Sequence, residues 1–304
     1  MLRLGLDIGG TKMEGILLDA AGHELMRRRI PTPQGYQAFL GGVSEFVNSF
    51  LAQAGEPATV GIGLPGAERR DNRLIKNANC LFLNGQSLRH DLEERLGQPV
   101  WLANDADCFT LSEARDGAGT GNRVVFGVIL GTGCGGGIVV DNRLLGGPNA
   151  LTGEWGHNPL PGYDPSYDGA EQTCYCGRSN CIERFVSGTG FAVRFAARYG
   201  SALSAPAILA AAASGDACAE AHYAHFVDAL ARSLASVINL LDPDVIVFGG
   251  GLSNLESLYQ DLALAVPNWV FGEQCRTRLL PARHGDSSGV RGAAWLPELH
   301  PMPG

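Results

Sequence analysis

The chain has too few clustered basic residues for a nucleic-acid-binding surface. Its 304 residues include 23 lysines and arginines against 31 acidic residues, a net charge of −8, and the longest basic run is Arg27-Arg28-Arg29. A surface that tracks nucleic-acid phosphates needs a larger patch of positive charge. Nucleic acid is therefore not expected as a partner.

The chain also lacks a segment typical of membrane insertion or secretion. The uncharged stretch Val124 to Val140 is shorter than the roughly 20 residues of a membrane span. The N-terminus runs from Leu2 to Leu6 directly to Asp7, a charge too early for the apolar core of a signal peptide. We therefore expect a cytoplasmic protein with no membrane partner.

A disulfide framework is not indicated either, although the chain has eight cysteines. Five of them stand singly in apolar surroundings, as buried thiols do: Cys80, Cys108, Cys134, Cys218 and Cys275. Only Cys174, Cys176 and Cys181 cluster, in a tract with few apolar residues. In a reducing compartment such a cluster indicates a metal site more often than a disulfide.

The hydrophobic pattern predicts two α/β lobes. With 45% hydrophobic and 18% charged residues, the chain can bury a core in two domains of ordinary size. Each half opens with a strand, a glycine turn and a second strand, at 2–7 and 13–19 and again at 124–130 and 137–140. Helices are predicted at 36–53, 88–96, 106–115, 205–213 and 222–241, and further strands at 59–64, 100–103 and 244–248. We expect an N-terminal lobe of residues 1–110 and a C-terminal lobe of residues 111–287.

Two glycine turns are candidates for binding phosphates. Small residues let backbone amides approach an anion, and a hydroxyl and an ammonium group add donors; the first turn supplies Asp7, Gly9, Gly10, Thr11 and Lys12. An ordinary glycine hairpin is the alternative. The second supplies Gly131, Thr132, Gly133, Gly135 and Gly136. It contains G-x-G-x-x-G, but a strand pattern follows where a dinucleotide-binding fold needs a helix, so we reject that interpretation.

These motifs, taken in order, resemble the ROK family of sugar kinases and sugar-responsive repressors. The motifs are D-x-G-G-T-K at 7–12, A-N-D-A at 103–106, G-T-G-x-G-G-G at 131–137, G-E-x-G-H at 153–157, C-x-C-G at 174–177 and G-G-G at 249–251. The resemblance implies the two-lobed actin-like (ribonuclease H-like) fold of the hexokinase type, with ATP and Mg²⁺ between the lobes. It also implies that Gly250 and Gly251 lie against the adenosine and that a C-terminal helix, 288–304, packs back on the first lobe. A homodimer is expected because the family commonly dimerises.

Asp105 is the expected catalytic base. It follows an apolar strand and begins a helix, where a carboxylate is stabilised as the anion; the alternative is a helix cap. The resemblance implies that it accepts the proton of the sugar hydroxyl during phosphoryl transfer. It further implies a set of sugar contacts: Asn79, Asn104, Asp105, Glu154, His157 and Glu183.

The three clustered cysteines predict structural zinc. With His157, the thiolates of Cys174, Cys176 and Cys181 would complete a Cys₃His set; free thiols are the alternative. Asn180 stands where the family pattern has glycine, and asparagine tolerates the left-handed backbone such a turn needs.

The substrate is expected to be fructose, with mannose as a second hexose. Within the family, the segments at 76–79, 83–86, 154–161 and 284–295 are most similar to bacterial fructokinases of the mannofructokinase type. N-acetyl-D-glucosamine is the alternative substrate. A non-catalytic sugar sensor or repressor is a remote alternative, because no winged helix-turn-helix precedes the first strand and the chain is acidic.

Overall fold

The computed structural model describes residues 1–272 and 274–299, which form two compact units. The first unit comprises residues 1–121, 137–152 and the segment from 286 onward. The second comprises residues 122–136 and 153–285. The predicted C-terminal helix is α10 (Ser288–Leu299), and residues 300–304 of that prediction lie outside the described residues.

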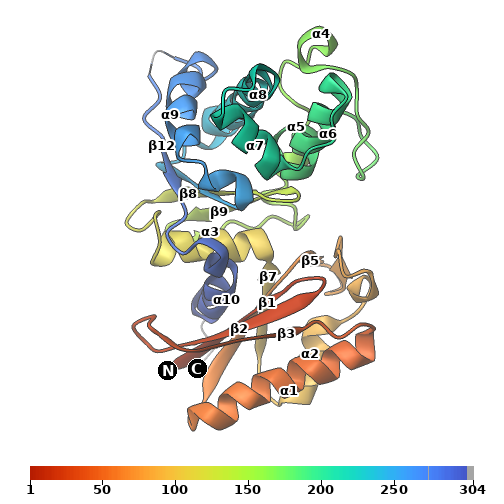
Figure 1. Cartoon of the computed structure of the whole chain (residues 1–304). Coiled ribbons are helices and arrows are strands. Elements are labelled where there is room, and N and C mark those ends of the chain that lie inside the picture. The colour runs from red at the N-terminus through yellow and green to blue at the C-terminus, as the bar shows by residue number, and fades with distance from the viewer. Residues whose placement is uncertain (273, 300–304) are drawn as a thin grey trace. The chain divides into compact units, whose positions relative to one another are not determined.

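The first sheet has the order β3-β2-β1-β4-β7 (Figure 1). Its strands are β1 (Leu2–Ile8), β2 (Lys12–Leu18), β3 (Glu24–Pro31), β4 (Ala58–Leu64) and β7 (Val100–Asn104). β1 pairs antiparallel with β2 and parallel with β4, and β4 pairs parallel with β7. The carboxyl ends of β1, β4 and β7 therefore share one edge of the sheet, where ligands of α/β proteins bind.

Helices α1 (Tyr36–Ala54) and α2 (Leu88–Leu96) cover one face of this sheet (Figure 1). α1 presents apolar side chains at helical spacing, and all are buried: Phe39, Leu40, Val43, Phe46, Val47 and Phe50. They pack with Leu4 and Leu6 of β1 in one apolar cluster. The two helices confirm the periods predicted at 36–53 and 88–96. A small hairpin, β5 (Ala67–Glu68) and β6 (Ile75–Lys76), and a short 3₁₀ turn (Leu81–Leu83) connect β4 to α2.

The other face carries α10 together with α3 (Asp105–Arg115). A Cβ built on Gly292 of α10 would lie 1.6 Å from the Cys108 carbonyl oxygen of α3. A Cβ on Gly61 of β4 would lie 1.9 Å from the Ala293 carbonyl oxygen. Both positions require glycine because backbone occupies the space of a side chain. The chain's last described helix is thus fixed to the helix that begins at Asp105.

The second sheet repeats the same layout in the order β10-β9-β8-β11-β12. Its strands are β8 (Val124–Leu130), β9 (Cys134–Val140), β10 (Arg143–Leu144), β11 (Val245–Gly249) and β12 (Arg278–Pro281). β8, β11 and β12 run parallel. The strand β12 was not predicted, because four residues with an arginine at one end and a proline at the other carry little strand pattern.

The second unit contains six α-helices among its described residues. They are α4 (Pro165–Asp168), α5 (Glu183–Val186), α6 (Gly188–Tyr199), α7 (Ala205–Ala213), α8 (Ala217–Leu241) and α9 (Glu256–Ala265), with 3₁₀ turns at 155–157, 251–254, 266–268 and 285–287. By length and composition alone α8 could cross a membrane, but 56% of its most apolar window is buried in the unit, as in a core helix of a globular protein.

The close packing of α10 on α3 should make a large contribution to the free energy of unfolding. Gly292→Ala forces a methyl group against the Cys108 carbonyl and should lower the free energy of unfolding by about 3 kcal/mol or more. Gly41→Ala in α1 is the control, since nothing lies within 4 Å of its Cβ position; it should leave stability unchanged or raise it by about 0.5–1 kcal/mol. Thermal melts of the two variants test this, and equal melting temperatures would contradict the packing described.

Candidate active site

The first glycine turn is fixed by hydrogen bonds to its carbonyl groups. The Gly9 amide donates to the Lys12 carbonyl at 3.0 Å. The Thr32 hydroxyl donates to the Gly9 carbonyl at 2.7 Å and the Thr32 amide to the Thr11 carbonyl at 3.0 Å. Gly10, Thr11 and Lys12 are exposed. With the carbonyls occupied, the tip of the turn offers its amides, a hydroxyl and an ammonium group, as an anion-binding turn requires.

Asp7 stands directly before this turn among other carboxylates. Burial is the main cause that raises its pKa to about 7, and the charges of Asp105 and Glu14 raise it further. Its position in β1 is opposite Glu14 on β2 and Gly63 on β4. Because like charges repel, this acidic group would gain from a bound divalent cation.

Asn104 and Asp105 occupy the junction between β7 and α3. The Ala106 amide donates to the Asn104 side chain at 2.9 Å and to the Asp105 carboxylate at 2.9 Å. Asn104 is therefore the helix cap, and Asp105 lies in the first helical turn, where an anion is stabilised. The alternative role, a helix cap, therefore applies to Asn104. It does not decide whether Asp105 is a catalytic base.

Asn79 joins the same region through the turn after β4. The Asn79 amide donates to the Pro65 carbonyl at 3.1 Å, and the Asn104 side chain donates to the Gly66 carbonyl at 3.3 Å. Asn79 itself is exposed. The first unit thus brings Asp7, the first turn, Asn79, Asn104 and Asp105 to the carboxyl ends of neighbouring strands.

The second glycine turn is held by a carboxylate and by the turn after β11. The Cys134 amide donates to Glu183 Oε2 at 3.0 Å, and the Gly188 amide donates to the Gly131 carbonyl at 2.7 Å. A Cβ on Gly250, where φ is 84°, would lie 2.6 Å from the Leu130 carbonyl group. The predicted phosphate-binding turn and the predicted adenosine-binding glycines, Gly250 and Gly251, therefore lie side by side in the second unit.

The segment 154–157 packs on this turn. The Trp155 ring nitrogen donates to the Gly135 carbonyl at 3.0 Å, and a Cβ on Gly156 would lie 2.5 Å from the Cys134 carbonyl oxygen. Glu154 is about half exposed, and its carboxylate lies 4.0 Å from His157 Nε2. Trp155 and Gly156 therefore pack on the same glycine turn that Glu183 holds, and Glu154 and His157 are their neighbours in the chain.

The four predicted metal ligands converge. One ligand atom from each of His157, Cys174, Cys176 and Cys181 lies within 4.8 Å of all the others. Cys176 and Cys181 sulfurs are 3.5 Å apart, and Cys174 Sγ is 3.7 Å from His157 Nδ1. Tetrahedral zinc with bonds of about 2.3 Å puts its ligands roughly 3.8 Å apart.

Burial and hydrogen bonds from the other cluster thiols raise the pKa of Cys181 to about 12. A bound cation is therefore needed to hold it as a thiolate. Asn180 has φ 56°, the left-handed conformation predicted for it.

Sequence reasoning missed Tyr175. Its hydroxyl lies 2.8 Å from His157 Nε2, so each imidazole nitrogen has a neighbour, a thiol on one side and a phenol on the other. The signal was its position between Cys174 and Cys176, because a residue between two ligands of one metal must lie near it.

The raised pKa of Asp7 predicts a pH-dependent stability. The pKa is about 7 in the folded chain against an ordinary 3.8, so the stabilisation from the proton is complete below 3.8 and is lost as the pH rises through 7. Asp7→Asn, which cannot ionise, should exceed the wild type in stability at pH 8 by about 1–4 kcal/mol without ligand, and by less at pH 5. Melts across that range test this, with exposed Asp71→Asn as the control that follows the wild type. An advantage independent of pH would contradict the burial of this carboxylate.

Sequence comparison finds named relatives along nearly the whole chain. An N-acetyl-D-glucosamine kinase of Salmonella typhimurium is 40% identical over 297 residues, 96% of this chain and 98% of that protein. An N-acetyl-D-glucosamine kinase of Vibrio parahaemolyticus is 38% identical over the same shares.

Solved structures share the fold. The ROK hexokinase of Thermus thermophilus has a TM-score of 0.86 and 29% identity, with 97% of each chain covered. A ROK family glucokinase of Streptomyces griseus, in complex with glucose and AMPPNP, has a TM-score of 0.75 and 28% identity, with 97% of this chain and 98% of that chain covered. The expected actin-like, hexokinase-type α/β fold is confirmed.

The prediction of a fructokinase is wrong, because these relatives at up to 40% identity are N-acetyl-D-glucosamine kinases. Two of the segments that suggested fructose, 76–79 and 83–86, contain side chains that serve the fold. The Asn84 side chain closes its own loop, accepting from the Ala78 amide at 2.8 Å and donating to the Ala78 carbonyl at 3.0 Å. Lys76 donates to the Asn149 carbonyl at 2.6 Å. The Lys76 and Asn84 side chains are engaged in these loop contacts, so they do not identify the sugar.

The family itself is established by a match that runs from one end of the fold to the other. The sequence model of the ROK family matches residues 3–299. That range includes both sheets, both glycine turns and the cysteine cluster. The chain belongs to the ROK family.

Proposed function

We propose that this protein transfers the γ-phosphoryl group of ATP to the 6-hydroxyl of N-acetyl-D-glucosamine. The observation that carries the proposal is the 40% identity, over 96% of the chain, to a protein of that named activity. The acidic strand ends and paired glycine turns supply groups that phosphoryl transfer needs. A homodimer and a cytoplasmic location stay predictions.

Asp105 acts as the general base. Phosphoryl transfer requires the attacking hydroxyl to be aligned and its proton to be accepted as the new bond forms. The carboxylate of Asp105 sits in the first turn of α3, where backbone amides favour its ionised form. Asn104 fixes this turn as its cap and anchors it to Gly66.

The glycine turns and Asp7 hold the nucleotide. Gly10, Thr11 and Lys12 at the tip of the first turn donate to phosphate oxygens, and Thr132 and Gly133 do so from the second turn. When Mg²⁺ is bound it neutralises phosphate charge, and Asp7 supplies a carboxylate beside it. Gly250 and Gly251 present a surface without side chains to the adenosine.

The sugar is recognised by Asn79, Asn104, Glu154, His157 and Glu183. Carboxylates and amides discriminate between sugars because a buried polar group left without a partner weakens binding. Glu183 already accepts from the Cys134 amide, so it couples the sugar contacts to the second glycine turn.

Zinc organises this part of the pocket from the Cys₃His cluster. His157 would bind the metal through Nδ1, which keeps the proton on Nε2, where Tyr175 is the neighbour. The metal would join the segment bearing Glu154 to the loop that leads to Glu183. A zinc ion held by all four of these residues would be structural, because no position would remain open for substrate or water.

Removing the base should abolish turnover and preserve binding. Asp105→Asn should lower kcat for N-acetyl-D-glucosamine about 10²–10⁴-fold. The KM for ATP should change little. Asp71→Asn, at an exposed loop position, is the matched control and should retain wild-type kcat. Coupled ADP-release kinetics give both constants, and a kcat near that of the wild type in Asp105→Asn would exclude it as the base.

Removing one thiol should release the metal. Cys176→Ser should reduce the zinc content from about one ion per chain to a small fraction of that, with a higher KM for the sugar. Cys218→Ser changes an exposed cysteine outside the cluster and should keep its zinc. Elemental analysis of the purified variants decides this, and equal zinc in both, or none in the wild type, would refute the metal site.

A further inference from the structure

A pocket of about 160 Å³ lies within the second unit, apart from the candidate site residues. Its apolar wall consists of Phe185, Phe191 and Phe226, contributed by α5, α6 and α8. Its polar lining includes four cationic or titratable side chains: Arg194, Arg198, His222 and His225. Since a single water needs only about 10–15 Å³ of such space, the pocket has room for a small polyatomic ligand.

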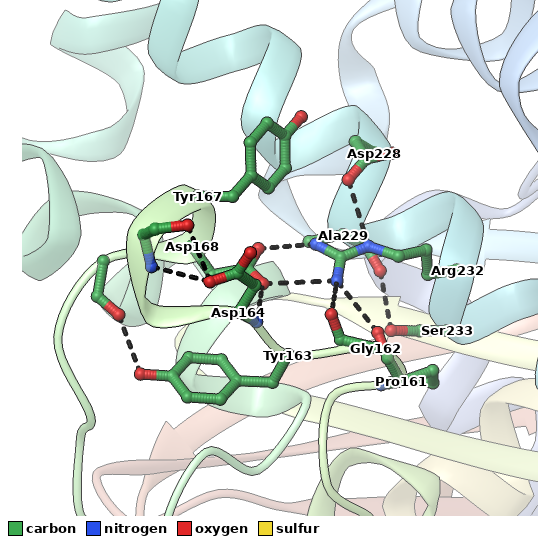
Figure 2. Close-up of polar contacts among 12 residues, drawn as sticks. Pro161, Gly162, Tyr163, Asp164, Tyr167, Asp168, Asp228, Ala229, Arg232 and Ser233 are labelled. Carbon is green, nitrogen blue, oxygen red and sulfur yellow. Dashed lines mark hydrogen bonds and ion pairs between the residues drawn. The ribbon is translucent and has the colours of Figure 1, made fainter.

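The acidic residue of this pocket is already neutralised. The Asp168 carboxylate accepts from both terminal nitrogens of Arg232 and from the Asp164 amide, and Figure 2 shows this pair enclosed by the loop 161–164. Only 4% of either side chain in the Asp168–Arg232 pair is exposed. The described hydrogen bonds of Asp168 to arginine thus go to Arg232, although its charge also acts on the nearby Arg194.

The charges around the pocket leave an excess of positive charge. Two arginines, Arg194 and Arg198, line it, and the one lining carboxylate, Asp168, is paired with Arg232. The lining therefore carries one more positive than negative charge, in a chain whose net charge is −8. Burial lowers the pKa of Arg194 to about 10, with Arg198 and Arg184 adding to the effect and Asp168 opposing it. A positive field of this kind favours an anionic ligand.

Arg194 is oriented for such a ligand. Its guanidinium carbon lies 4.0 Å from the centre of the Phe185 ring, a stacked position that leaves the edge of the guanidinium free to donate. Its Nη1 is buried and has no hydrogen-bond partner among the described residues. His222, only 5% exposed, donates from Nε2 to the Phe191 carbonyl at 2.8 Å. Burial lowers the pKa of His222 to about 4, so the ring is neutral and Nδ1, which has no partner in the described part of the chain, can only accept a hydrogen bond, as from the hydroxyl of hydrogen phosphate.

We propose that this pocket binds a phosphate dianion, either inorganic phosphate or the phosphoryl group of a small ester. The buried edge of Arg194 offers a donor without a partner in the described residues, Arg198 lines the same pocket, and a guanidinium edge suits tetrahedral oxyanions. The phenylalanine wall accommodates the carbon part of an ester. The site is separate from the proposed catalytic function, because its residues touch neither glycine turn by any contact described above.

Binding is measured by calorimetry and thermal shift with inorganic phosphate and, separately, with N-acetyl-D-glucosamine 6-phosphate. The wild type should bind at least one of them saturably, and this binding should persist in Lys12→Ala, which alters the first glycine turn. The ligand bound in that way identifies the source of the phosphate. Arg194→Gln should weaken that binding by about tenfold or more. Arg276→Gln removes the same charge from an exposed position of the same unit and should bind as the wild type does.

Two outcomes overturn the proposal. Equal binding by the wild type and Arg194→Gln would exclude the pocket, as would binding that Lys12→Ala removes and Arg194→Gln does not, since the phosphate would then sit in the first glycine turn. If Arg194→Gln does not fold, Arg198→Gln at the exposed rim replaces it and should weaken binding several-fold. None of these readouts depends on sugar phosphorylation, so failure here and failure of the kinase assignment are distinguishable.

Discussion

The close backbone contact of α10 with α3 and β4 is the constraint on which the first half of the candidate site depends. Gly292 and Gly61 permit an approach that any side chain would prevent, and Ser288 adds a buried hydrogen bond of 2.7 Å to Glu113 of α3. Fixed in this way, α3 begins at the end of β7 and presents Asp105 beside the acidic end of β1. Gly292, near the end of the chain, thereby helps to position Asp105, in the first half of the chain.

In the second unit, the loop 163–181 has few apolar residues, so hydrophobic burial contributes little to its order. Short backbone bridges join Pro159 to Cys181 and Thr173 to Ser179, and the Cys₃His cluster gathers at their centre. A metal there would supply the ordering free energy that hydrophobic burial supplies elsewhere. The same loop continues into Glu183, so its order reaches the second glycine turn.

The sequence predicted the parts that depend on local pattern or on motif. The amphipathic periods of α1 and α2 and the fold class were confirmed, since helical period and turn chemistry are local properties. Substrate identity was not predictable from the segments around Lys76 and Asn84, because whether a polar side chain faces a ligand or closes its own loop depends on tertiary contacts. The pocket lined by Arg194 and Arg198 could not be predicted from the sequence for the same reason. Its lining residues lie between positions 168 and 229, and only folding brings them together.

The central claim concerns the acetamido group, which distinguishes N-acetyl-D-glucosamine from glucose at one carbon. The most direct measurement is kcat/KM with ATP and Mg²⁺ for N-acetyl-D-glucosamine, glucose and N-acetyl-D-mannosamine side by side, with the product phosphate located by NMR. The account predicts the highest value for N-acetyl-D-glucosamine and a phosphate on its 6-oxygen. A higher kcat/KM for glucose or N-acetyl-D-mannosamine, or no turnover of N-acetyl-D-glucosamine, would contradict it.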